Sequence, residues 1–184
     1  MPTALVAIAD GSEDIETVSI IDVLRRAEID VTVASVMPDR PQVTAARGTR
    51  IEADMLIDAC RDQVFDAIAL PGGMPGAETL GNCDMLMDMA REQLDAGRVL
   101  GAICAAPAVA LEPSGLLARK RVTCYPAFAE RISSGTWLDE PVVRDGQLIT
   151  SQGPGTAIAF GLALVGALVS AESAEQIGQQ MLAA

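Results

Sequence analysis

The chain has 184 residues, of which 50% are hydrophobic and only 3% aromatic, so its core must consist mainly of aliphatic side chains. The formal net charge is −12, and so acidic a surface repels phosphate backbones and anionic lipid. We therefore expect no stable nucleic-acid binding and no membrane attachment.

The most apolar stretch, residues 157–169, is shorter than the roughly 20 residues that span a bilayer. No basic signal region precedes the first strand pattern, which indicates a cytoplasmic protein, and residues 1–184 are expected to form a single domain.

The first part of the chain combines apolar runs of strand length with one long helical pattern. Residues 3–9 are apolar on both faces, as in a fully buried strand, and residues 30–36 predict a second strand. Between them, Ser12 is a candidate N-cap for a helix that runs through Arg26. Residues 42–45 and 49–52 could form a small hairpin. The helix is expected to bury a stripe at helical spacing, formed by Ile15, Val18, Ile21 and Leu24.

The second part of the chain continues the alternation of strands and helices. Residues 66–70 predict a core strand, followed by a tight loop over 71–76 and a helix over 83–96. Residues 99–104 predict another buried strand, and a helix follows with Pro107 in its first turn. The remaining expected elements are a strand over 121–124, a hairpin over 141–150 with its turn at Asp145-Gly146, and helices over 157–169 and 171–182.

Alternating strands and helices, with strands apolar on both faces, predict an α/β fold with a mostly parallel central sheet and helices on both faces. Functional sites in such sheets lie beyond the carboxyl ends of the strands. Each of three loops, residues 10–16, 71–76 and 104–107, follows a predicted core strand. We therefore expect these loops to converge.

Cys104 is the strongest candidate for chemistry because it lies where a buried strand meets a helix. Unpaired N–H groups and the helix dipole favour thiolate there, and can lower the pKa of a cysteine from about 8.5 to roughly 3.5–7.5. A buried structural thiol fits the local sequence equally well. Glu16 is the candidate carboxylate beside it, because Glu13 and Asp14 are expected to point outward. An ordinary charge at a helix N-terminus is the alternative for Glu16.

A glutamate next to a thiolate tends to keep its proton, because two negative charges at contact distance repel each other. A protonated Glu16 could donate a hydrogen bond to the sulfur and act as a general acid. The backbone N–H groups of Gly72 and Gly73 suit an oxyanion site, although a tight turn explains these glycines just as well.

The residue types that are absent narrow the chemistry. The chain has no histidine, which excludes Ser-His-Asp and Cys-His catalysis. Its four cysteines, at positions 60, 83, 104 and 124, form no C-x-x-C pair, so we expect free thiols and no metal site. No G-x-G-x-x-G or P-loop pattern occurs, and we expect no cofactor.

Four motifs occur in the order seen in the ThiJ/PfpI superfamily. The chain most resembles the branch that holds the Parkinsonism-associated deglycase and bacterial YajL-type proteins, over nearly its whole length. This resemblance implies a flavodoxin-like three-layer sandwich and a homodimer. The motifs are Gly11-Ser12-Glu13-Asp14-Ile15-Glu16-Thr17, Leu70-Pro71-Gly72-Gly73, Ala102-Ile103-Cys104-Ala105-Ala106-Pro107 and Ser151-Gln152-Gly153-Pro154-Gly155-Thr156.

The resemblance also implies roles for individual residues. It makes Cys104 the nucleophile and Glu16 its carboxyl partner, with backbone amides at Gly73 and Ala105 for an anion or oxyanion. Tyr125 stands where some members carry a histidine, but a tyrosine titrates near ~10, too high for an efficient base at neutral pH. A peptidase activity is therefore not expected. The remaining positions that the resemblance assigns to the pocket or the dimer interface are Gly72, Arg26, Arg47, Tyr125 and Pro154.

The motifs and the resemblance together predict a cofactor-independent glyoxalase or deglycase. Its substrates would be methylglyoxal-type 2-oxoaldehydes or their early glycation adducts, with Cys104 as nucleophile and Glu16 as proton shuttle. The alternative is an oxidative-stress sensor or redox-regulated thiol chaperone that works through oxidation of the same cysteine.

Overall fold

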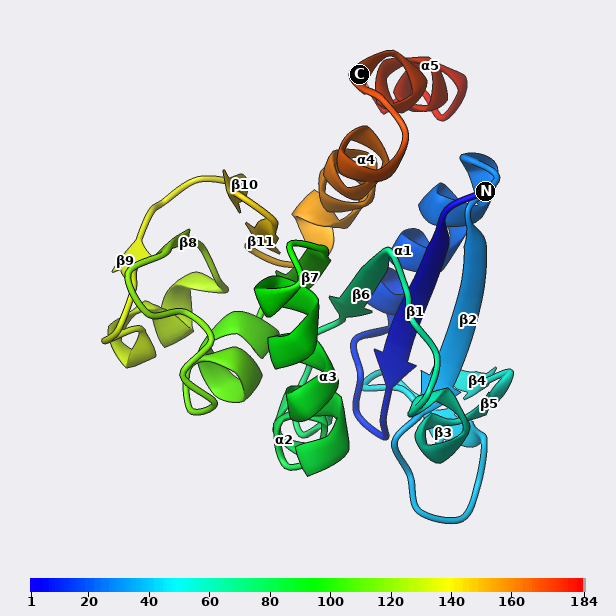
Figure 1. Cartoon of the computed structure of the whole chain (residues 1–184), viewed down its shortest axis with the longest axis vertical. Coiled ribbons are helices and arrows are strands. Elements are labelled where there is room, and N and C mark those ends of the chain that lie inside the picture. The colour runs from blue at the N-terminus through cyan, green and yellow to red at the C-terminus, as the bar shows by residue number, and fades with distance from the viewer. Residues whose placement is uncertain (184) are drawn as a thin grey trace.

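A seven-stranded sheet forms the centre of the protein in the computed structural model, which describes residues 1–183 (Figure 1). The strand order is β10-β11-β7-β6-β1-β2-β5, and only the β10–β11 pair is antiparallel. This topology confirms the predicted α/β fold with a mostly parallel sheet. The strands are β1 (Thr3–Ile8), β2 (Asp30–Ser35), β5 (Met55–Leu56), β6 (Ala67–Leu70), β7 (Val99–Ile103), β10 (Val142–Asp145) and β11 (Leu148–Ser151).

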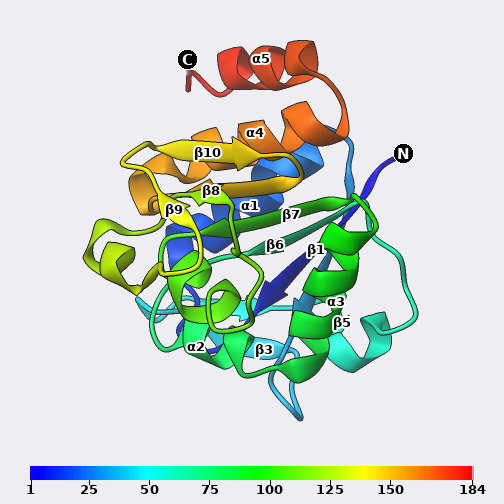
Figure 2. The ribbon, with the colours of Figure 1, turned by 60° about the vertical axis from the view of Figure 1, so that its left-hand side comes forward.

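Helices cover both faces of this sheet, which confirms the three-layer sandwich (Figure 2). Helices α1 (Asp14–Arg26) and α4 (Ala157–Leu168) pack together on one face, and α5 (Ala171–Gln180) lies outside α4. The other face carries α2 (Gly76–Gly81) and α3 (Asp84–Asp95). Within residues 1–183, none of the helices has the length and apolar character needed to cross a membrane.

Short elements surround the sandwich. The predicted hairpin is present as the antiparallel pair β3 (Gln42–Thr44) and β4 (Arg50–Glu52). Helix α2 was not predicted. The helix predicted after Cys104 is present as a π-helical element, η2 (Pro107–Leu111), with Pro107 at its start. The other short elements are η1 (Ile57–Cys60), β8 (Arg121–Val122), η3 (Pro126–Arg131), β9 (Thr136–Trp137) and η4 (Pro154–Thr156).

The three central strands are buried along almost their whole length and form the middle of the core. Small residues allow the helices to approach them closely. A Cβ added at Gly101 of β7 would lie 2.9 Å from Cζ of Phe160 in α4, so a larger residue there would force the packed helix side chains to shift. This packing holds the carboxyl ends of β1, β6 and β7 in a fixed relation to one another.

Helix α1 starts differently from the prediction. Its N-cap is Glu13, not Ser12: the Glu13 carboxylate accepts a hydrogen bond of 2.8 Å from the backbone N–H of Glu16. The Ser12 hydroxyl instead accepts a bond of 3.0 Å from the N–H of Ala9 at the end of β1. The cap residue therefore lies one position later along the chain.

The predicted buried stripe of α1 was wrong at two positions. Ile15 is 56% exposed and Val18 is 51% exposed. The capping Glu13 carboxylate fixes the start of the helix so that Glu16 faces the protein interior, and one turn of rotation per 3.6 residues then sets the remaining inward positions. The residues of α1 that are buried are Glu16, Thr17, Ile20, Val23 and Leu24.

Candidate active site

The three loops predicted to converge do meet at the carboxyl ends of the central strands. The N–H of Glu13, after β1, donates to the carbonyl of Gly72, after β6, at 2.9 Å. In return, the N–H of Gly72 donates to Oε2 of Glu16 at 2.7 Å. Gly72 also lies against the third loop, because a Cβ added there would be 2.6 Å from the Cβ of Cys104. These contacts bring Glu16 and Cys104 into one site.

Cys104 has a backbone conformation that a non-glycine residue rarely adopts. Its φ is +63°, in the left-handed region, which costs on the order of 1–3 kcal/mol and persists only where the surroundings enforce it. Two hydrogen bonds do so: its N–H donates to the carbonyl of Ser151 at 2.9 Å, and its carbonyl accepts from the N–H of Tyr125 at 2.8 Å. The thiol, on a residue that is 8% exposed, is thereby aimed at the loop junction.

Glu16 is a fully buried carboxyl with one unsatisfied oxygen. Oε2 accepts from Gly72, whereas Oε1 finds no nitrogen or oxygen donor in the described part of the chain. Burial raises the pKa of Glu16 from 4.5 to about 7, against the lowering by its bonds to Gly72 and Cys104. Near neutral pH this carboxyl therefore exchanges a proton readily, and Oε1 is the oxygen free to carry it.

The pKa of Cys104 moves opposite to the sequence-based expectation. Burial and the negative charge of Glu16 raise it to about 12, and the N–H groups of Gly73 and Ala105 offset only part of this. The expected lowering took account of the backbone N–H groups at the strand end but not of burial and the charge of Glu16, which outweigh them. Because the repulsion disappears when Glu16 is neutral, the thiol and the carboxyl behave as one coupled group.

A cavity of about 330 Å³ opens over the Cys104 thiol. A larger one, about 480 Å³, lies at the opposite end of the sheet beside Met1, but it is lined by no cysteine and by Asp66 as its single carboxylate. We therefore assign the chemistry to the smaller cavity. In residues 1–183, no three side chains of metal-binding type gather in one place. The cavity over the thiol is lined by Glu13, Ala46, Arg47, Gly73, Met74, Cys104, Ala105, Tyr125, Phe128 and Pro154.

Most of the residues predicted for the site lie at this cavity. Cys104, Gly73, Ala105, Arg47, Tyr125 and Pro154 line it, and Glu16 lies buried behind it. Their roles in a reaction stay predictions. The prediction that the N–H of Gly72 serves an oxyanion was wrong, because this N–H donates to Glu16 and is therefore not available.

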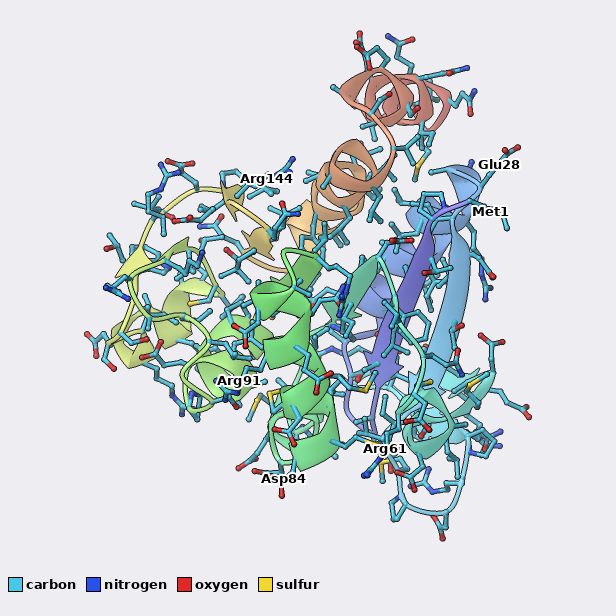
Figure 3. The ribbon with its side chains drawn as sticks, in the orientation of Figure 1. Met1, Glu28, Arg61, Asp84, Arg91 and Arg144 are labelled. Atoms are coloured by element: carbon cyan, nitrogen blue, oxygen red, sulfur yellow. The ribbon has the colours of Figure 1, made fainter. Side chains whose placement is uncertain are left out.

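The prediction that Arg26 lies at the pocket was also wrong. Arg26 is the last residue of α1 and forms an ion pair with Asp22 at 2.6 Å. Figure 3 shows Glu28, two residues further on, at the end of the molecule that carries Met1, where β1 begins. The site lies where β1 ends, so Arg26 does not reach it. The thirteen residues of α1, about 20 Å long, separate Arg26 from Glu13. The two residues are close in sequence but lie at opposite ends of the helix.

Sequence reasoning missed several residues of the cavity. Glu13 was expected to point outward, but its capping bond turns the carboxyl inward and it is buried. Met74 and Ala46 carried no local signal. Phe128 carried a weak one, since it is one of three phenylalanines in the chain and lies three residues after Tyr125.

Fold and site together define an α/β protein with a strained cysteine at the end of a central parallel strand and a buried glutamate beside it. A model of the DJ-1/PfpI family matches residues 2–167, and the chain belongs to this family. The predicted resemblance to the ThiJ/PfpI superfamily is thereby confirmed.

Several relatives are similar over nearly the whole chain. Protein DJ-1 homolog B of Arabidopsis thaliana is 41% identical over 181 residues, which are 98% of this chain but only 41% of that protein. The chain likewise spans 46% of Arabidopsis DJ-1 homolog A. Glutathione-independent glyoxalase DJR-1.2 of Caenorhabditis elegans is 35% identical over 91% of this chain and 89% of its own. The structure of oxidized Toxoplasma gondii DJ-1 superposes with a TM-score of 0.97 at 41% identity, covering 100% of both chains.

We expect Glu16 to make the stability of the fold depend on pH. Its pKa is raised in the folded protein, so its contribution is complete below about pH 4.5 and is lost as the pH rises through about 7. The Tm of the wild type should therefore fall between about pH 5 and about pH 8 more steeply than that of Glu16→Gln. Thermal unfolding followed by circular dichroism measures both slopes.

The exposed Glu92 offers a matched control, because Glu92→Gln makes the same change outside the site and should keep the wild-type slope. Parallel slopes for wild type and Glu16→Gln would contradict the raised pKa of Glu16.

Proposed function

We propose that this protein is a cofactor-independent glyoxalase that converts methylglyoxal and similar 2-oxoaldehydes into 2-hydroxy acids. The observation that carries the proposal is the coupled pair of Cys104 and Glu16, whose carboxyl has a pKa of about 7, at the base of an open cavity. A base of this strength is well matched to neutral pH. The name of the C. elegans relative, a glutathione-independent glyoxalase, supports the same reaction class.

In the proposed first step, the sulfur of Cys104 attacks the aldehyde carbon. The Glu16 carboxylate accepts the thiol proton as the C–S bond forms and returns it to the aldehyde oxygen, which gives a hemithioacetal and leaves Glu16 ionised for the next step. The N–H groups of Gly73 and Ala105 flank the sulfur, so they can stabilise the negative charge that develops beside it.

The remaining steps move one proton between two carbons. Glu16 removes the proton from the former aldehyde carbon while water protonates the ketone oxygen, which gives an enediol. Glu16 then delivers its proton to the neighbouring carbon, and the hydroxyl on the first carbon releases its proton to water as the C=O bond forms. The first carbon is oxidised and the second is reduced, so no external oxidant is needed. The product is a thioester of Cys104, which water hydrolyses to release the 2-hydroxy acid and the thiol.

We expect loss of either group to abolish or cripple lactate formation from methylglyoxal. Cys104→Ala should reduce the rate to the uncatalysed background, because no other thiol is among the residues that line the cavity. Glu16→Gln should lower kcat/KM by about 100-fold or more, since it cannot carry the proton. Enzymatic detection of lactate gives both values, with Cys83→Ser as a matched cysteine control outside the cavity.

The pH profile of the wild type is a second readout of the same proposal. The pair must lose one proton before the sulfur attacks, so kcat/KM should rise with pH through about 7 and then level off. Activity that survives in Cys104→Ala, or a wild-type profile that falls with pH over this range, would overturn the mechanism.

Deglycation requires no second site under this proposal. Early methylglyoxal adducts form reversibly, so removal of free aldehyde drains them by mass action. A glyoxalase would therefore restore modified proteins without touching the adducts.

A sensor of oxidative stress is the second candidate function. A sulfinate at Cys104 would accept hydrogen bonds from Gly73 and Ala105, and a neutral Glu16 would add another. That a related structure, from T. gondii, is of an oxidized form supports this candidate. The same groups that would serve catalysis would thus stabilise the oxidised sulfur.

We expect dilute peroxide to add two oxygen atoms to Cys104 before it modifies the other cysteines. Cys60 and Cys124 are fully buried, and burial raises the pKa of Cys83, which is more exposed than Cys104. At Cys104 the carboxylate of Glu16 can accept the thiol proton, which would activate this sulfur. Peptide mass spectrometry over a peroxide series measures the order. Modification of Cys83 first, or of all four together, would count against a dedicated sensor.

We further propose a homodimer that uses the exposed face of α1. Ile15 and Val18 present apolar side chains there, and an exposed apolar patch is typical of an interaction surface. Val18→Asp should therefore convert a dimer into a monomer in light scattering coupled to size exclusion, because a charge would be buried without a partner. Val64→Asp is the matched control, since Val64 is 71% exposed on another face. A monomeric wild type would contradict the proposal.

A further inference from the structure

We infer that the preferred substrates carry an aromatic or similarly bulky apolar group on the ketone carbon, and that Tyr125 and Phe128 bind this group. The inference rests on the proposed glyoxalase reaction and narrows its substrate class. It assigns Phe128, which has no part in the proton transfers, a role in specificity.

The cavity is much larger than methylglyoxal requires. Its volume of about 330 Å³ corresponds to roughly eleven molecules of liquid water at about 30 Å³ each. Methylglyoxal bears only a methyl group on its ketone carbon, so most of the cavity would stay filled with water around it. A larger apolar substituent would displace that water and gain the free energy of apolar burial.

The lining of the cavity is divided between polar and apolar groups. Glu13, Arg47 and the thiol bring polar atoms, whereas the other side chains that line the cavity are mostly apolar. The apolar ones are Ala46, Met74, Ala105, Tyr125, Phe128 and Pro154. Such a division fits a molecule that is polar at its reacting end and apolar at the other.

Aromatic side chains are rare in this chain, which makes their place informative. It has one tyrosine, one tryptophan and three phenylalanines. Phe65 and Phe160 are core residues. The single tyrosine and the remaining phenylalanine both line the cavity, and Tyr125 is 45% exposed there. A side chain left open to solvent in this way contributes little to the core and is free to contact a ligand.

Backbone hydrogen bonds connect this aromatic pair directly to the nucleophile. The N–H of Tyr125 donates to the carbonyl of Cys104 at 2.8 Å, and the N–H of Phe128 donates to the carbonyl of Tyr125 at 2.8 Å. The two ring centroids are 6.3 Å apart with an angle of 57° between the planes. The guanidinium of Arg131 lies 5.0 Å from the Phe128 centroid and restrains that ring. The rings are therefore held at a set position relative to the sulfur before substrate binds.

The test compares phenylglyoxal, whose ketone carbon bears a phenyl ring, with methylglyoxal. We expect wild type to have the higher kcat/KM on phenylglyoxal. Phe128→Ala should lower the ratio of kcat/KM on phenylglyoxal to kcat/KM on methylglyoxal by about 10-fold. The change should appear in KM more than in kcat, because the lost contact is made to the bound ring and not to the reacting atoms. Phe128→Leu keeps most of the apolar volume and should lower this ratio less. It serves as the second variant if Phe128→Ala does not fold.

Val64→Ala removes an exposed apolar side chain outside the cavity and should leave the ratio unchanged. Initial rates are required, since phenylglyoxal also modifies arginine and Arg47 lines the cavity. Equal kcat/KM values on both substrates, or an unchanged ratio in Phe128→Ala, would overturn the inference while leaving the glyoxalase intact. No turnover of either aldehyde would instead refute the proposed function itself.

Discussion

Burial of the Glu16 carboxyl is the constraint on which the site depends. In water the carboxyl of a glutamate is ionised at neutral pH, and its carboxylate is too weak a base to take a proton from a neighbouring thiol. Enclosed between the loops after β1 and β6, the same carboxyl has a pKa of about 7, and its Oε1 has no nitrogen or oxygen donor in the described part of the chain. Desolvation thus converts an ordinary acidic residue into a group that can both accept and return a proton near physiological pH.

The fold sustains several locally unfavourable features to hold this arrangement. Cys104 has a left-handed backbone, Glu16 has an unsatisfied buried oxygen, and the carboxyl of Glu13 lies close enough to raise the pKa of Glu16 further. Each of these costs free energy. The buried aliphatic strands β1, β6 and β7 offset that cost, because their packing fixes the positions at which the three loops begin. Rigid strands therefore supply the precision that the loops alone lack.

Features that depend on the local sequence pattern were predicted correctly. Predictions were wrong where the outcome depends on contacts between residues that only the fold brings together. Apolar runs and turn residues were enough for the parallel sheet, the hairpin at Gly146 and the convergence of Glu16 with Cys104. The exposure of Ile15 followed from a cap, at Glu13, that a pattern of apolar spacing does not contain. The pKa of Cys104 was misjudged because its largest causes, burial and the charge of Glu16, arise only when the chain folds.

The lack of histidine gives the carboxyl its importance in the proposed reaction. The chain has no imidazole, and the carboxyl of Glu16, with a pKa of about 7, is the group beside the sulfur that is matched to proton transfer near neutral pH. Tyr125 lines the cavity and takes no part in the proposed proton transfers, so it is available for binding. In the proposed reaction, proton transfer and substrate recognition would thus fall to different sides of one cavity, and a change on the aromatic side would alter which aldehyde binds without altering how it reacts.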